Sequence, residues 1–299
     1  MIARAGADNV VERILRQGRL DFSVAFKVQT RWGRMEAVAW TLECAGAMLF
    51  TASALAGELL AGMAAGVALV AAAIVLLLMH LGQPLNAWRA FANLRQSWLS
   101  RGTLALAGFV LLGGLYVLLR LAGVPPEATA VAALRWLLIA DAAFILAYPG
   151  LVLSASPAIP FWNSGLMPLI SLANGAASGA ALFLLLVPSG ARTGAVSAGA
   201  VFLAWALIAL GTFVWLQVVV TLSRGAAAAE SAACLTRAHG FLFWFGACLA
   251  GIAIPLALAL WLVTGGNPAL IPFLAAARLP GDYALRAALL RSGLFEKPV

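Results

Sequence analysis

The chain has 299 residues, of which 64% are hydrophobic and only 10% are charged, and its mean hydropathy is +1.00. Soluble domains are roughly 45–50% apolar, so this composition excludes an ordinary soluble protein and indicates a polytopic membrane protein. The formal net charge of +8 is not accompanied by a compact basic domain or an aromatic stacking platform, so we expect no nucleic acid among the partners.

Apolar stretches long enough to cross a membrane, which takes about 20 helical residues, recur along the chain. Eight are found, over residues 37–56, 62–81, 103–122, 132–153, 166–187, 196–222, 241–264 and 269–292. They predict an all-α fold, a polytopic bundle of about eight transmembrane helices over residues 37–295. A basic cytoplasmic segment is expected over residues 1–36.

Basic residues are distributed unevenly between the two sides of this predicted bundle. Three lie on the side opposite the N-terminus, namely Arg120, Arg135 and Arg192, and the other 16 of the 19 lie on the N-terminal side. We expect a bacterial inner membrane, and by the positive-inside rule both termini are predicted to face the cytoplasm. Residues 1–34 contain no apolar run followed by a small-residue cleavage site, so we expect no cleaved secretory signal.

The second predicted span runs into a stretch with many polar residues, MHLGQPLNAWRAFANLRQSWLSRG, over residues 79–102. It includes His80, one of only two histidines, and we expect Gly82 and Pro84 to end the helix just after it. The remainder has one polar and one apolar face, which predicts a short interfacial helix. A histidine at the mouth of a bundle can exchange a proton near neutral pH. On pattern alone, a basic interfacial anchor is the alternative.

Ionisable residues also fall within predicted spans, where they are costly and therefore candidates for function. Glu43 and Asp141 lie in the first and fourth spans, and Arg278, Asp282 and Arg286 lie four residues apart in the eighth. This spacing predicts ion pairs of Asp282 with both arginines along one helix face that packs against other helices. The alternative for the isolated acids is a neutral carboxyl group that joins helices by hydrogen bonds.

The connection after the fourth span has no charge over residues 147–168 and contains Trp162 next to Asn163, so it suits burial within protein. Tyr148 lies at its start, and His239 precedes the seventh span on the same side. The chain has no nucleophile triad, Walker loop or dinucleotide fingerprint. Its three cysteines are too scattered for a metal cluster. The residues therefore predict a pocket for a hydrophobic, proton-coupled ligand such as a quinone.

Three blocks carry a family resemblance. Residues 79–102 resemble the histidine-leucine-glycine, tryptophan-arginine and serine-tryptophan-leucine-serine-arginine block of membrane anchor subunits of the dimethyl sulfoxide reductase (DmsC-like) type. Residues 147–180 resemble the tyrosine-proline-glycine and proline-x-tryptophan-asparagine block shared with polysulfide reductase (NrfD-like) anchors, and residues 279–295 resemble their final helix. The likeness extends over about residues 35–295.

The resemblance implies an anchor that binds an iron–sulfur subunit, which exchanges electrons with a molybdopterin catalytic subunit. The anchor would exchange electrons with menaquinone or ubiquinone and hold no haem or metal of its own. His80 would be the residue most closely tied to the quinone, and the segment from Arg89 to Arg101 would border the site or the docking surface. The orientation then predicts catalytic partners in the cytoplasm.

Chemistry suggests a role for each candidate. His80 would hydrogen-bond one quinone oxygen, and Arg89 would stabilise negative charge or pair with the partner. The other quinone-site candidates would line the ring or bond the second oxygen; they are Tyr148, Trp162 and Asn163. The docking candidates lie in the polar stretch; they are Arg95, Trp98 and Arg101.

The chain departs from the family pattern at two positions. Gly102 stands where family members commonly have glutamate, and Asn86 stands where many have arginine. If that glutamate relays protons, Glu43 or Asp282 is the expected substitute, and Asp141 is a further candidate for a relay.

Three alternatives to quinone exchange remain at this stage. One is an anchor with a b-type haem between His80 and His239. Another is a proton-translocating protein without quinone chemistry. The last is a structural anchor that has lost quinone exchange, which Gly102 would favour.

Overall fold

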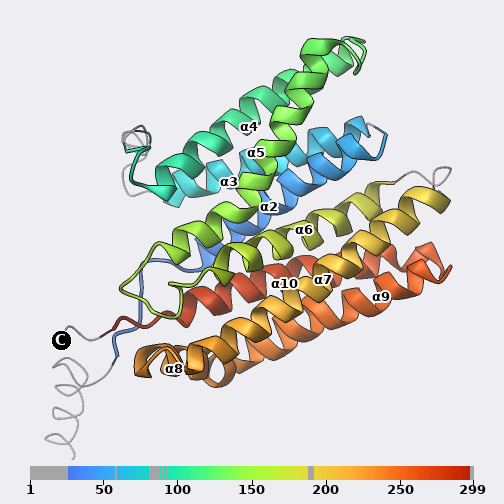
Figure 1. The fold of residues 1–299 in the computed structure, drawn as a ribbon. Helices are drawn as coiled ribbons and strands as arrows, with labels where there is room; N and C mark the ends of the chain where they lie inside the picture. The colour runs from blue at the N-terminus through green and yellow to red at the C-terminus, as the bar shows by residue number, and fades with distance from the viewer. Residues whose placement is uncertain are drawn as a thin grey trace, which may run out of the picture.

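The computed structural model describes residues 26–57, 59–80, 88, 91, 93–187 and 192–296, and these residues form an all-helical bundle (Figure 1). Within these ranges no strand occurs beyond one isolated bridge. The long helices are α2 (Arg34–Leu55), α3 (Leu60–His80), α4 (Trp98–Leu121), α5 (Thr129–Ser154), α6 (Leu166–Leu186), α7 (Arg192–Leu222) and α10 (Ile271–Arg291). The predicted all-α fold is confirmed.

Seven helical segments in the described residues are long and apolar enough to cross a membrane. They are α2 to α7 and a continuous segment from Phe241 to Val263. The chain is therefore a multi-pass membrane protein. The remaining long helix, α10, has 21 residues but also carries the charges of the predicted eighth span. An eighth crossing and cytoplasmic termini stay predictions, as does the division at residue 36.

Helix α4 begins earlier than the hydropathy pattern predicts. The Ser97 hydroxyl oxygen accepts a hydrogen bond from the Ser100 backbone N–H at 3.3 Å, so Ser97 caps the helix and Trp98 is its first residue. The end of the predicted interfacial helix therefore belongs to α4. Most of that predicted helix, residues 81–87, 89, 90 and 92, lies outside the described residues.

The seventh span is a π-helix (Phe241–Ala253) that continues as the α-helix α9 (Ile254–Val263), which hydropathy does not predict. Its Gly251 lies against Gly281 of α10, where an added Cβ would come within 2.1 Å of the Gly251 Cα. The Gly251 carbonyl also accepts a hydrogen bond from Arg278 at 3.1 Å. Small residues thus let α10 approach this helix closely enough to use its backbone.

The two ends of the described chain meet at one end of the bundle. The Gln29 backbone N–H donates to the Gly293 carbonyl at 3.0 Å, and the Phe295 N–H donates to the Lys27 carbonyl at 2.9 Å. The side chain of Gln29 adds a hydrogen bond to the Leu290 carbonyl at 2.6 Å. Helix α8 (Ala226–Ala233) and the ends of α3 and α5 lie at this same end (Figure 1). We call it the terminal end.

Helices α2 and α6 form the interior of the bundle. Helix α2 packs against α3, α5, α6 and α10, and α6 packs against α2, α5, α7 and α10. In each, 72% of the most apolar window is buried, against 22–33% for the other spans. Polar side chains on the buried faces of α2, α6 and α10 are therefore shielded from lipid. They include Glu43 on α2 and the charged face of α10.

Candidate functional site

The main cavity has a volume of about 450 Å³ and lies at the terminal end, between the start of α2, the end of α3 and the start of α4. Ligand pockets in proteins typically have roughly 300–1,000 Å³, so a ring-sized molecule fits. The side chains that can ionise or hydrogen-bond along its wall are Arg31, Trp32, Glu36, Trp40, His80, Thr103 and Tyr148. The rest of the wall is mostly aliphatic.

The side chains of His80 and Glu36 face each other at this cavity. The His80 Nε2 atom lies 3.5 Å from Glu36 Oε1, and the two side chains are 52% and 17% exposed. The other carboxylate oxygen, Oε2, accepts the Gly33 backbone N–H at 2.7 Å, as in a helix capping box. The cavity thus contains a histidine whose partner is anchored to the first turn of α2.

Sequence reasoning missed Glu36. The local signal was available, because glutamate at the third position of a helix is typical of a cap. Its contact with His80 was not predictable locally, since 44 positions separate them and the contact depends on how α2 packs against α3.

Aromatic rings line the inner part of the cavity. Trp32 and Trp40 meet edge to face, with ring centroids 5.2 Å apart. Tyr148, on α5, is only 2% exposed and lines the same cavity as His80, so two of the predicted site residues come together. The Tyr148 ring lies over Gly102, where an added Cβ would be 2.0 Å from the ring atom Cε2.

Trp162 and Asn163 do not line this cavity. The Trp162 indole N–H donates to the Leu289 carbonyl at 3.0 Å, and its ring centroid is 6.2 Å from that of Trp32, so Trp162 lies behind the wall. Asn163 is exposed, and its backbone carbonyl accepts a hydrogen bond from Arg224 at 2.6 Å. These contacts join segments of the chain at the terminal end. They do not support direct contact of Trp162 or Asn163 with a ligand in the main cavity.

The predicted docking residues have internal contacts. The Arg101 guanidinium donates to the Leu94 carbonyl at 2.8 Å and to the Arg95 carbonyl at 2.7 Å, and it lies 4.5 Å from the Trp98 ring centroid. Arg101 therefore holds the chain before α4, while Arg95 is exposed. Arg89 lies outside the described residues, as does Asn86.

A second set of polar residues is buried at the centre of the bundle. Asp282 Oδ1 lies 2.6 Å from Arg286 Nε, and the Asp282 carboxylate also accepts hydrogen bonds from Asn174 and Ser178 of α6, each at 2.6 Å. Asp282 and Arg286 are 0% and 5% exposed. The prediction that this helix face packs inward and pairs Asp282 with Arg286 is confirmed.

The predicted pairing of Arg278 with Asp282 is wrong. Arg278 is fully buried and hydrogen-bonds instead to Asn174 and to the Gly251 carbonyl. The physical reason is that α6 and the π-helix supply acceptors closer to the guanidinium group than the carboxylate one turn away. Spacing along one helix could not show these acceptors.

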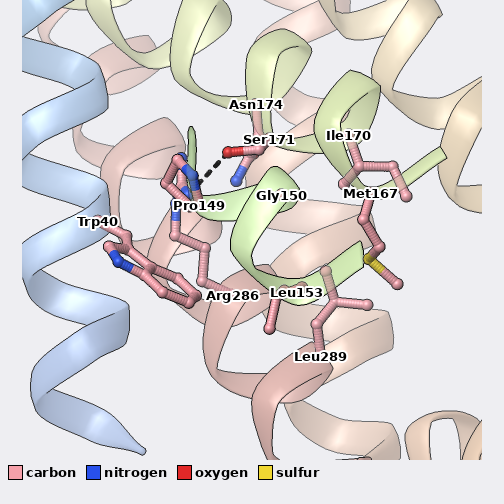
Figure 2. Close-up of a pocket in the computed structure, with 10 residues that line it drawn as sticks. All are labelled: Trp40, Pro149, Gly150, Leu153, Met167, Ile170, Ser171, Asn174, Arg286 and Leu289. Atoms are coloured by element: carbon pink, nitrogen blue, oxygen red, sulfur yellow. Dashed lines mark hydrogen bonds between the residues drawn. The ribbon is translucent and has the colours of Figure 1, made fainter. Parts of the chain in front are cut away.

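A small cavity with a volume of about 20 Å³ lies next to Arg286. Figure 2 shows the residues that line it. Arg286 donates to the Ser171 hydroxyl at 3.4 Å, and its Nη2 atom has no hydrogen-bond partner within the described residues. A water molecule needs roughly 10–15 Å³ of such space, so the cavity has room for about one. Trp40 lines this cavity and the main one, and therefore separates them.

The three predicted relay acids are not brought together. Glu43 is fully buried, lies within electrostatic range of Arg286 and Tyr148, and has no hydrogen bond to either carboxyl oxygen in the described part of the chain. Asp282 belongs to the central network. Asp141 is partly exposed on α5, and no described contact joins it to the other two. No group of three His, Cys, Asp or Glu side chains among the described residues is arranged to hold a metal ion.

The family model described as polysulphide reductase, NrfD, matches residues 35–296. No curated protein matches the chain. Because the family model covers most of the sequence, the chain belongs to the NrfD family, membrane subunits of polysulphide reductase-type complexes.

Proposed function

We propose that this protein is a quinone-interacting anchor subunit, which exchanges electrons between the membrane quinone pool and an iron–sulfur subunit of a molybdopterin oxidoreductase. The observation that carries the proposal is the cavity of about 450 Å³ in which the His80–Glu36 pair meets a mostly apolar wall. A quinone requires this combination, since its ring and tail are apolar while its oxygens exchange protons during electron transfer.

The lining suggests how a quinone would lie. His80 bonds one ring oxygen, Tyr148 borders the ring, and the edge-to-face tryptophans form an aromatic wall. Leu78 of α3 and Leu99 of α4 line the cavity and are 36% and 50% exposed. The isoprenoid tail therefore leaves between α3 and α4. Menaquinone and ubiquinone both fit this description.

The terminal end is the proposed docking side for the electron-transfer partners, and the cytoplasmic side. Electrons must pass between the quinone and a cluster in another polypeptide, so the quinone cavity and the docking surface belong at the same end. The positive-inside distribution of Lys and Arg supports the cytoplasm. We also propose α10 as the eighth span, because its charges are buried against other helices and both described chain ends lie together.

A b-type haem is less well supported than a quinone. His80 is at the end of α3, which packs against α2 and α4, whereas His239 lies between two π-helical segments that pack against α8 and α10. The carboxylate partner of His80 suits a proton-exchanging imidazole better than an axial ligand facing His239. The resemblance to dimethyl sulfoxide reductase anchors remains an expectation about subtype.

The test compares His80→Gln with His239→Gln in the assembled complex, using menadiol as the electron donor. General acid–base groups typically contribute about 10²–10⁴-fold to rate, so we expect His80→Gln to lower kcat at least 100-fold with the complex intact. His239→Gln should retain the parental rate. Equal rates for the His80 variant and the parent would refute the proposed site.

A further inference from the structure

We propose that Glu36 is the positioning residue of the quinone site: it fixes the tautomer of His80 and accepts the Nε2 proton when His80 takes up a proton from a hydroquinone hydroxyl. The inference deepens the proposed function and rests on it. The observation behind it is the placement of one carboxylate: the Gly33 N–H holds Oε2 at 2.7 Å, and Oε1 faces His80 Nε2 at 3.5 Å.

This geometry selects one form of the imidazole. A neutral imidazole has one N–H donor and one acceptor nitrogen, and an acceptor placed beside Nε2 favours the proton on Nε2. The other nitrogen, Nδ1, is then left with its lone pair for a ligand hydroxyl. Because Oε2 is held by the backbone of the first turn of α2, Glu36 cannot turn away without breaking the helix cap.

Glu36 also supplies the acid that this chain lacks at Gly102, where family members commonly have glutamate. Among the described residues that line the main cavity it is the one carboxyl group, and the charged or titratable groups that share the wall are Arg31, His80 and Tyr148. The expected substitutes, Glu43 and Asp282, are fully buried and do not line this cavity. With 17% of its side chain exposed, Glu36 can release a proton to water.

The proton step balances as follows for the hydroxyl of a hydroquinone bound to His80. The O–H bond breaks, its proton binds His80 Nδ1, and the Nε2 proton passes to Glu36 Oε1. One electron leaves to the one-electron acceptor of the proposed partner, an iron–sulfur cluster, and the second electron and the second hydroxyl proton leave in a later step. Reduction of a quinone takes up two electrons and two protons in the reverse order, and this oxygen receives its proton through the same atoms.

The two histidines make the tautomer directly measurable. With ¹⁵N-labelled histidine the chain gives signals from two imidazoles alone, His80 and His239. We expect the Nε2–H form at His80 in the parent protein in lipid nanodiscs. In Glu36→Gln the amide oxygen keeps the Gly33 hydrogen bond and the amide N–H₂ faces Nε2, so His80 should change to the Nδ1–H form.

Glu127→Gln is the matched control, because Glu127 is exposed in the α4–α5 connection at the opposite end of the bundle. It should leave both imidazoles unchanged, and His239 should be unchanged in every variant. Identical His80 signals in the parent and Glu36→Gln would overturn the inference. Failure of the proposed function would look different: menadione would leave the His80 signals unaltered in the parent, while the tautomer still responded to Glu36.

Kinetics in the assembled complex give a second readout. Glu36→Gln retains a hydrogen bond from His80 Nδ1 to the quinone oxygen but removes the proton acceptor. The loss should therefore be in kcat for menadiol, by at least about 10-fold, with KM changed less than about 3-fold. A rise in KM at unchanged kcat would contradict the proton role and would indicate that Glu36 acts only in binding.

Discussion

Gly102→Ala is predicted to destabilise the protein and weaken quinone binding, although a change from glycine to alanine inside a helix usually stabilises by up to about 1 kcal/mol. The reason is the Tyr148 ring. A Cβ at Gly102 would lie 2.0, 2.3 and 2.4 Å from three ring atoms, whereas ordinary contacts are 3.4–4 Å. The ring is buried between α4 and α5 and stacks on Phe144.

The size of the effect follows from the distances. Restoring normal carbon–carbon contact of about 3.5 Å requires the ring or α4 to move by about 1.5 Å. Overpacking of this kind costs about 1–3 kcal/mol, which exceeds the helix gain. Since Tyr148 lines the main cavity, displacement of its ring also alters the wall that a quinone would contact.

The assay is unfolding by SDS titration in mixed micelles, together with quenching of tryptophan fluorescence by menadione. Gly108→Ala is the control, because it lies on the same helix and nothing lies within 4 Å of its added Cβ. In a Tyr148→Ala background, which lacks the ring, Gly102→Ala should no longer lower stability, so the losses of the two single variants should not add. Equal stabilities of Gly102→Ala and Gly108→Ala would refute the close contact between the Tyr148 ring and Gly102.

Two further predictions concern the interior of the bundle. Asp282→Asn should lower the free energy of unfolding by about 3–5 kcal/mol, because Arg286 would be left as a buried charge without the carboxylate it pairs with. Glu43→Gln loses no hydrogen bond and is the matched comparison in the same SDS titration, and equal losses in the two variants would contradict the argument. Gly281→Ala should separate α10 from the π-helix, because its Cβ would meet the Gly251 Cα at 2.1 Å. We expect its SDS midpoint to be lower than that of Gly211→Ala, whose Cβ has its contact at 3.9 Å, and equal midpoints would refute the prediction.

Hydropathy predicts most of this fold because the signal is local. Each apolar stretch of about 20 residues becomes a helix, and the ends differ by a few residues where a cap such as Ser97 begins the helix earlier. The π-helix is not predictable in this way. Within it, Gly251 packs closely against Gly281, and this contact joins residues 30 positions apart.

The residues of the candidate site also differ in how far sequence can predict them. His80 and Tyr148 stand out by residue type and were predicted, whereas Glu36 looks like an ordinary helix cap until α3 is packed against α2. Trp162 and Asn163 follow the family block closely, yet they lie behind the wall or at the surface. Residue type thus identifies chemistry, but only packing decides which side chains share a cavity.

The central network and the polar part of the main cavity differ in a way that bears on the proposed function. In the central network, Asp282 is saturated by Arg286, Asn174 and Ser178, which suits a rigid joint between α6 and α10. In the main cavity, the His80–Glu36 contact is longer, partly exposed and open to a ligand. A group that must gain and lose protons needs this looser setting, because a saturated network would have to break several hydrogen bonds at each turnover. This difference supports the proposal that proton exchange with a quinone takes place at the terminal end, whereas the charged face of α10 joins the helices that shape the cavity.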